Sequence, residues 1–78
     1  MEFEVGARVR VRSDPEFGPG PWPAEPIATI IGAAETLQGR DGPLTSYWVK
    51  FDEPQTDADG DGPYVNSQVL EQYLDPLP

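Results

Sequence analysis

Three aspartates at alternate positions form the most distinctive chemical motif of the chain. Asp57, Asp59 and Asp61 are followed by Gly62, and alternate carboxylates in a tight turn can converge on one cation. Calcium prefers several hard oxygen ligands at one point, so this spacing predicts a candidate Ca²⁺ site and no other cofactor. The alternative is an Asp/Gly turn that solvates the tip of a hairpin.

The same motif resembles the first half of an EF-hand loop, but the residues that follow exclude that assignment. Gln68 stands where an EF-hand places its bidentate glutamate, eleven residues after Asp57. A strand is expected to lead into the loop, whereas an EF-hand needs a helix there. The metal hypothesis is therefore a looser calcium loop on a hairpin, with Asp52, Glu53 or Glu71 as further ligands.

Aromatic side chains form a second candidate site. Trp22, Trp48 and Tyr64 are the residues expected to contact a protein partner, because exposed aromatic residues are enriched in interaction hot spots. The alternatives are internal packing. Trp22 can pin its own loop onto the fold, and the proline-rich segment 19–26 can cover Trp48.

Few residues of the chain are suited to catalysis. Its 78 residues include no Cys and no His, which excludes disulfides, zinc fingers, thiol nucleophiles and imidazole acid–base chemistry. The carboxylates gather in turns where water keeps them ionised, whereas a general acid needs a buried carboxyl group. We therefore expect no enzyme.

Acidic residues dominate the charge. Fourteen acids and five bases give a net charge of −9, and five of the acids fall between Asp52 and Asp61. Such a charge repels phosphate backbones and anionic lipids, so we expect neither nucleic acid nor a membrane as partner. No stretch has the apolar character of a signal peptide or the length of a membrane helix. We expect a cytoplasmic monomer.

Alternating apolar and polar residues predict a strand at residues 3–12. The residues expected to face the core are Phe3, Val5, Ala7, Val9 and Val11, with a turn or bulge at Gly6. The opposite face of this strand carries three of the five bases, Arg8, Arg10 and Arg12. These arginines can pair with the acidic loops or accept an acidic partner.

The strongest strand pattern of the chain covers residues 46–52. In this segment, Tyr47, Val49 and Phe51 share one face and Trp48 points outward. The remaining segments are assigned from their turn residues and shorter apolar runs. Further strands are expected near residues 27–32, 63–66 and 73–77, with loops at 13–26 (proline-rich), 33–45 (turn at 39–43) and 53–62 (acidic), and a helical or 3₁₀ turn over 66–71.

The order of these motifs resembles an SH3-like barrel. The chain reads Val5-Gly6-x-Arg8-Val9-x-Val11, then Thr29-Ile-Ile-Gly32, then Tyr47-x-Val49-x-Phe51, and it ends with Val69-(x)₄-Leu74. It is most similar to the barrel of nitrile hydratase β subunits, which opens with a Gly-x-x-Val-x-Val strand. The resemblance covers most of the chain and implies one domain over residues 1–78. That domain is an all-β barrel of about five short antiparallel strands, with long loops and one short 3₁₀ turn near the C-terminus.

The resemblance implies a fold and no activity, because function depends on sites and not on architecture. Gly18-Pro-Gly-Pro-Trp-Pro23 replaces the His-bearing segment of that family. We expect a non-enzymatic protein-interaction or accessory module. The alternatives are a calcium-binding module and an acidic decoy or inhibitor of a basic partner.

Overall fold

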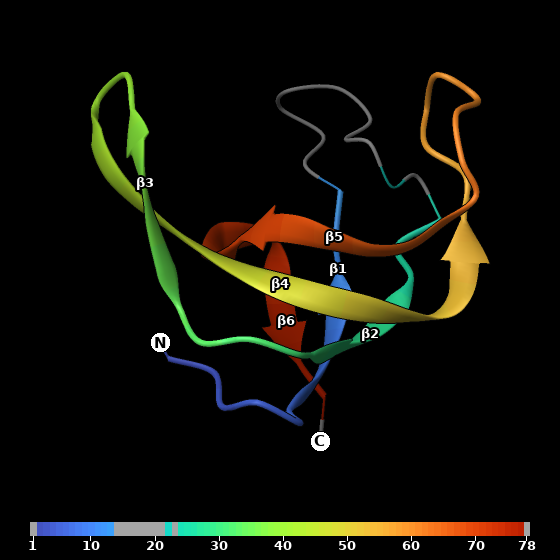
Figure 1. The fold of residues 1–78 in the computed structure, drawn as a ribbon, viewed down its shortest axis with the longest axis horizontal. Coiled ribbons are helices and arrows are strands. Elements are labelled where there is room, and N and C mark those ends of the chain that lie inside the picture. Colours follow the sequence, from blue (N-terminus) through green and yellow to red (C-terminus); the bar gives the residue numbers. More distant parts are fainter. Residues whose placement is uncertain (1, 14–21, 23, 78) are drawn as a thin grey trace.

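Six antiparallel strands curl into a half-barrel in the computed structural model, which describes residues 2–13, 22 and 24–77 (Figure 1). The elements are β1 (Arg8–Val11), β2 (Ile27–Ile30), β3 (Glu35–Gly39), β4 (Gly42–Gln55), β5 (Tyr64–Leu70), the 3₁₀ turn η2 (Glu71–Tyr73) and β6 (Leu74–Pro76). The all-β class, the antiparallel strands and the 3₁₀ turn near the C-terminus are confirmed.

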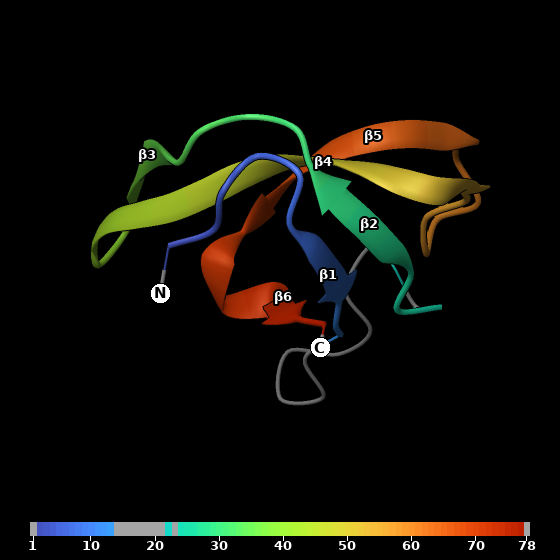
Figure 2. The ribbon, with the colours of Figure 1, turned by 90° about the horizontal axis from the view of Figure 1, so that it is seen from below.

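The long strand β4 organises the sheet. It pairs with β3 and β2 along one edge and with β5 along the other, and the path continues from β2 through β1 to β6. Figure 2 shows the resulting curl, with β4 and β5 on one side and β1 and β6 on the other. The core fills the concave space between these two sides.

Alternation places the core residues as predicted in β1 and β4. Val9 and Val11 are buried in β1, and Tyr47, Val49 and Phe51 are buried in β4. The rest of the core consists of Trp22, Ala28, Ile30, Val69 and Leu74. Strand alternation therefore assigns one face of these strands to the core and the other to solvent.

The first predicted strand, residues 3–12, is shorter in the structure. A turn at Gly6, whose φ is +95°, precedes β1, and the Gly6 N–H donates to the Ile30 carbonyl at 2.8 Å. Val5 lies in this turn and is 66% exposed, so its predicted inward position is wrong. Phe3 and Ala7 do pack against the core.

Residues 33–45, predicted as a loop, include most of a β-hairpin. Strand β3 pairs with the start of β4, and the turn lies between Gly39 and Gly42, inside the predicted turn at 39–43. The loop prediction failed because every residue of β3 from Glu35 to Gln38 is exposed, which leaves no alternating pattern in the sequence. Gly42 has a φ of +127°, a value that glycine adopts readily.

The predicted helical turn over 66–71 is wrong in position. Residues 66–70 belong to β5 because they pair with β4, in the register from Lys50↔Asn66 to Ser46↔Leu70. The 3₁₀ turn follows at Glu71–Tyr73 and has no side-chain cap. Tertiary pairing here overrides the turn preference of Asn66 and Ser67.

Most of the proline-rich loop 13–26, including Phe17, lies outside the described residues. The described ends of the loop meet, since the Glu25 carboxylate accepts a hydrogen bond from the Ser13 N–H at 2.9 Å. Among the described residues, none forms a helix of the length and apolarity needed to span a membrane.

Candidate functional site

The face of the sheet opposite the core, termed the outer face here, gathers residues from four strands. The register aligns Arg8 with Thr29, Thr29 with Lys50, and Lys50 with Asn66, so these four side chains form one row across β1, β2, β4 and β5. The next row contains Trp48, which is paired with Gln68. Directly opposed residues of a sheet project on the same side, which is why these rows share a face.

Trp48 and Ile31 form an exposed apolar pair on the outer face. Ile31 directly follows β2, and its N–H donates to the Trp48 carbonyl at 2.9 Å, which joins this end of β2 to β4. Trp48 is 40% exposed and Ile31 is 43% exposed. Large apolar side chains exposed side by side are typical of a surface that another protein covers.

A charged pair lies elsewhere on the outer face, with Arg8 in the row of Lys50. Arg8 donates from both terminal nitrogens to Asp52, at 2.7 Å and 2.5 Å, and also to the Thr29 hydroxyl at 2.8 Å. The hydrogen bond from Arg8 lowers the pKa of the Asp52 carboxyl and Asp52 raises that of the guanidinium. Because about half of each side chain is exposed to water, the pair fixes geometry more than it adds stability.

Trp22 and Tyr64 lie together, but on the other side of β4. Trp22 is 8% exposed, and its ring packs edge-on against Phe51 at 4.8 Å and Tyr64 at 5.6 Å between centroids. The three aromatic residues predicted to contact a partner therefore do not share one surface. Trp22 belongs to the core, while Tyr64 and Trp48 keep 40% exposure at separate places.

The predicted cover over Trp48 was the proline-rich segment 19–26. Within the described part of that segment, Trp22 packs against Phe51, on the core side of β4. Trp48 projects from the opposite side of the strand and stays exposed. The parity prediction that sends Trp48 outward is confirmed.

The acidic loop is held by its own aspartate. Asp57 Oδ1 accepts hydrogen bonds from the N–H groups of Asp59 at 3.0 Å and Asp61 at 2.9 Å. In the described part of the chain, no group of three or more acidic side chains is placed to hold a metal ion. The calcium hypothesis for these residues stays a prediction. Titration with millimolar Ca²⁺ tests it, and unmoved amide signals at residues 57–62 would reject it.

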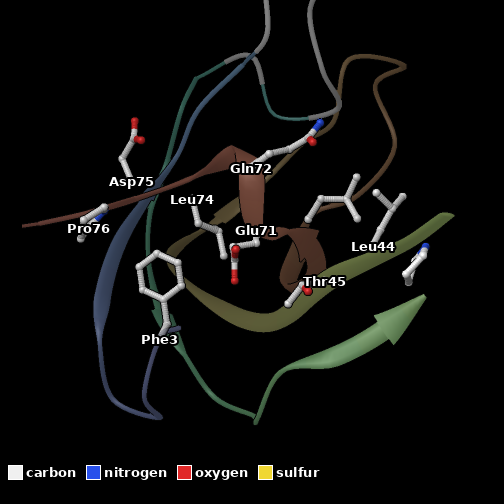
Figure 3. A pocket seen from close by; sticks show the side chains of 10 residues that line it. Phe3, Leu44, Thr45, Glu71, Gln72, Leu74, Asp75 and Pro76 are labelled. Carbon is white, nitrogen blue, oxygen red and sulfur yellow. The ribbon is translucent and has the colours of Figure 1, made fainter. Parts of the chain in front are cut away.

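A groove of about 360 Å³ lies beside the 3₁₀ turn and draws its lining from widely separated segments. Figure 3 shows Phe3 and Leu44 on opposite sides of the groove, with Glu71 between them. The buried Tyr47 hydroxyl accepts from the Phe3 N–H at 3.0 Å and donates to the Glu71 carboxylate at 3.4 Å, which fixes the Phe3 wall. Sequence reasoning missed this groove, because nothing in the local pattern links its segments.

Comparisons of the chain with protein-family models, with curated proteins and with solved structures found no match. The function is therefore argued from the geometry of these surfaces.

Proposed function

We propose that this protein is a non-enzymatic, monomeric interaction module that binds another protein through its outer face. The observation that carries the proposal is the exposed pair of Trp48 in β4 and Ile31, the residue that directly follows β2. A tryptophan on a rigid strand offers a large apolar contact area at a small entropic cost, because the strand already restricts its side chain. Trp48 is then the central contact of the surface.

We also propose that the half-barrel is an SH3-like barrel. Five strands, β1, β2, β4, β5 and β6, follow the expected plan, and the 3₁₀ turn separates the last two. The final strand β6 returns to pair with β1, which supports closure of a small barrel. Strand β3 is an addition that extends β4 into the hairpin.

Residues beside Trp48 support a contact role for this face. Gln68 pairs with Trp48 across the strands, and its side-chain amide donates to the buried Ser46 hydroxyl at 2.9 Å. The strand beneath Trp48 is anchored on the core side by Tyr47 and Val49, both fully buried. The contact surface is thus held on a rigid element, which limits the ordering cost of binding.

Site-specific photo-crosslinking inside the cells that make the protein tests the proposal. A photoreactive phenylalanine analogue replaces Trp48 in one variant and Leu37 in a matched control, since Leu37 is 38% exposed in the hairpin. We expect a discrete crosslinked product from position 48 and none from position 37. Equal products from both positions, or no product from position 48, would refute the proposed contact face.

The size of the product separates two kinds of partner. A product of twice the mass of the chain would identify a second copy and contradict the monomer. A product of any other mass supports a different protein as the partner. Trp48→Ala, in a chain that carries the analogue at Ile31 instead, serves as the companion variant. Loss of the tryptophan should abolish capture from position 31 while thermal unfolding still shows a folded domain.

A further inference from the structure

The basic residues of this acidic protein are concentrated on the outer face. Four of the five bases lie on this side: Arg8 and Arg10 in β1, Arg12 directly after it, and Lys50 in β4. Three of the fourteen acids, Glu35, Asp52 and Asp75, share it in the register of the strands, which leaves eleven acids and one base for the rest of the chain. The outer face is thus a positive region on a molecule of net charge −9.

Local pairing uses only part of this positive charge. Arg8 pairs with Asp52, and Arg12 lies 3.6 Å from Asp75 and donates to the Gln72 carbonyl. Among the described residues, Arg10 and Lys50 make no ion pair. Lys50 is flanked in register by the uncharged Thr29 and Asn66.

Lys50 is also the charged residue nearest to the apolar pair along β4. It lies two residues from Trp48 and projects on the same side of the strand. Glu35, which pairs with Ser46, lies on the outer face on the other side of Trp48 from Lys50 along the direction of β4. A partner segment that runs along β4 from Trp48 towards Asp52 therefore passes over Lys50 first.

We infer that the partner segment which docks on the outer face is acidic as well as apolar, and that its carboxylates face Lys50 and Arg10. This inference rests on the proposed function, because it assumes that Trp48 marks the contact surface. Charge at an interface mainly selects the partner and its orientation, since like charges placed together cost free energy. An acidic partner meets like charge on most of this molecule and opposite charge at the outer face.

The net charge of −9 does not prevent such binding. Interactions between exposed charges are screened over about 8 Å at physiological salt, and the molecule measures 29 × 29 × 21 Å. The acidic residues on the far side of the fold are therefore largely screened from a bound segment. Local complementarity at the outer face decides which segment binds there.

Two short capped peptides, one alternating Glu with Leu and one alternating Lys with Leu, test the inference. The chain has two tryptophans, so its NMR spectrum has two indole N–H signals, and Trp48→Phe identifies the signal of Trp48. We expect the Glu peptide to shift this signal at physiological salt. We expect the Lys peptide to bind at least about tenfold more weakly, a difference of about 1.4 kcal/mol.

Charge reversal locates the effect. Lys50→Glu should weaken binding of the Glu peptide about fivefold or more, as expected when attraction becomes repulsion at an exposed pair. Arg40→Glu makes the same change of charge in the hairpin turn and should leave the affinity within about twofold. An equal effect of both variants would overturn the inference, because net charge alone would explain it.

The remaining outcomes separate this inference from the proposed function. Equal or tighter binding of the Lys peptide at Trp48 would overturn the inference of an acidic partner, but it would agree with the proposed contact face. No shift of the Trp48 signal with either peptide would also overturn the inference. The photo-crosslinking experiment then decides independently whether Trp48 touches a partner.

Discussion

The hydroxyl of Tyr47 offers a sharp test of how the groove wall is built. Tyr47→Phe removes one oxygen from a side chain that is fully buried. The Phe3 N–H loses its acceptor at 3.0 Å, and the Glu71 carboxylate loses a donor at 3.4 Å. A half-buried amide without a partner costs about 1–2 kcal/mol, and the longer bond to Glu71 adds little to that figure.

This loss is large for so small a domain. A domain of this size is stable by about 5 kcal/mol, so the variant should stay folded but melt earlier. A change of about 1.5 kcal/mol corresponds to a fall of about 6–12 °C in Tm. Phe3 should also exchange its amide proton faster, since the N-terminal segment is no longer held against the groove.

Thermal unfolding followed by circular dichroism measures the effect, with Tyr64→Phe as the matched control. Tyr64 is 40% exposed, and its hydroxyl makes no hydrogen bond to the described residues. We expect that variant to lie within about 0.5 kcal/mol of the natural protein. Equal melting temperatures for Tyr47→Phe and Tyr64→Phe would refute the assigned role of the Tyr47 hydroxyl.

Three further predictions test the site assignments. Trp22→Ala should lower the free energy of unfolding by about 3–5 kcal/mol because it empties a core position, and Trp48→Ala should lower it clearly less. Equal losses measured by chemical denaturation would contradict the assignment of Trp22 to the core and of Trp48 to the surface. Arg8 lowers the pKa of Asp52 below its ordinary value of 3.8. The pair therefore stabilises the fold at a pH above 3.8, and this stabilisation is lost as the pH falls through the lower pKa of the folded state. Arg8→Gln should return the Asp52 titration, followed by carbon NMR, towards 3.8, and an unchanged titration would reject the pairing. Gly62→Ala should destabilise the acidic loop by about 1–3 kcal/mol, because φ is +130° and the new Cβ would lie 2.9 Å from a backbone oxygen; an unchanged melting temperature would show that the loop adapts.

Alternation is the feature that made part of the fold predictable from sequence. In β1 and the centre of β4, buried and exposed residues alternate strictly, and the sequence pattern reproduced both faces. In β3, four consecutive residues are exposed, so no pattern distinguished the strand from a loop. In β5, polar residues favoured a turn, but pairing with β4 holds them in an extended strand.

The candidate sites depended on tertiary structure more than the strands did. The sequence predicted that Trp48 projects outward, because parity in a strand is a local property. It left open whether Trp22 packs inside or binds a partner, and the ring contact with Phe51 decides for packing. The groove beside the 3₁₀ turn needs Phe3 and Leu44 on opposite sides, which only the curled sheet provides.

By itself, the sequence determined the all-β class, the net charge of −9 and the outward direction of Trp48, since each follows from composition or from local alternation. Only the tertiary structure decided where the charges lie relative to one another. Lys50 joins the row of Arg8 through Thr29, because strand register aligns residues that are far apart in the chain. Register depends on hydrogen bonds between strands and on the packing of the core, and neither can be read from one segment alone.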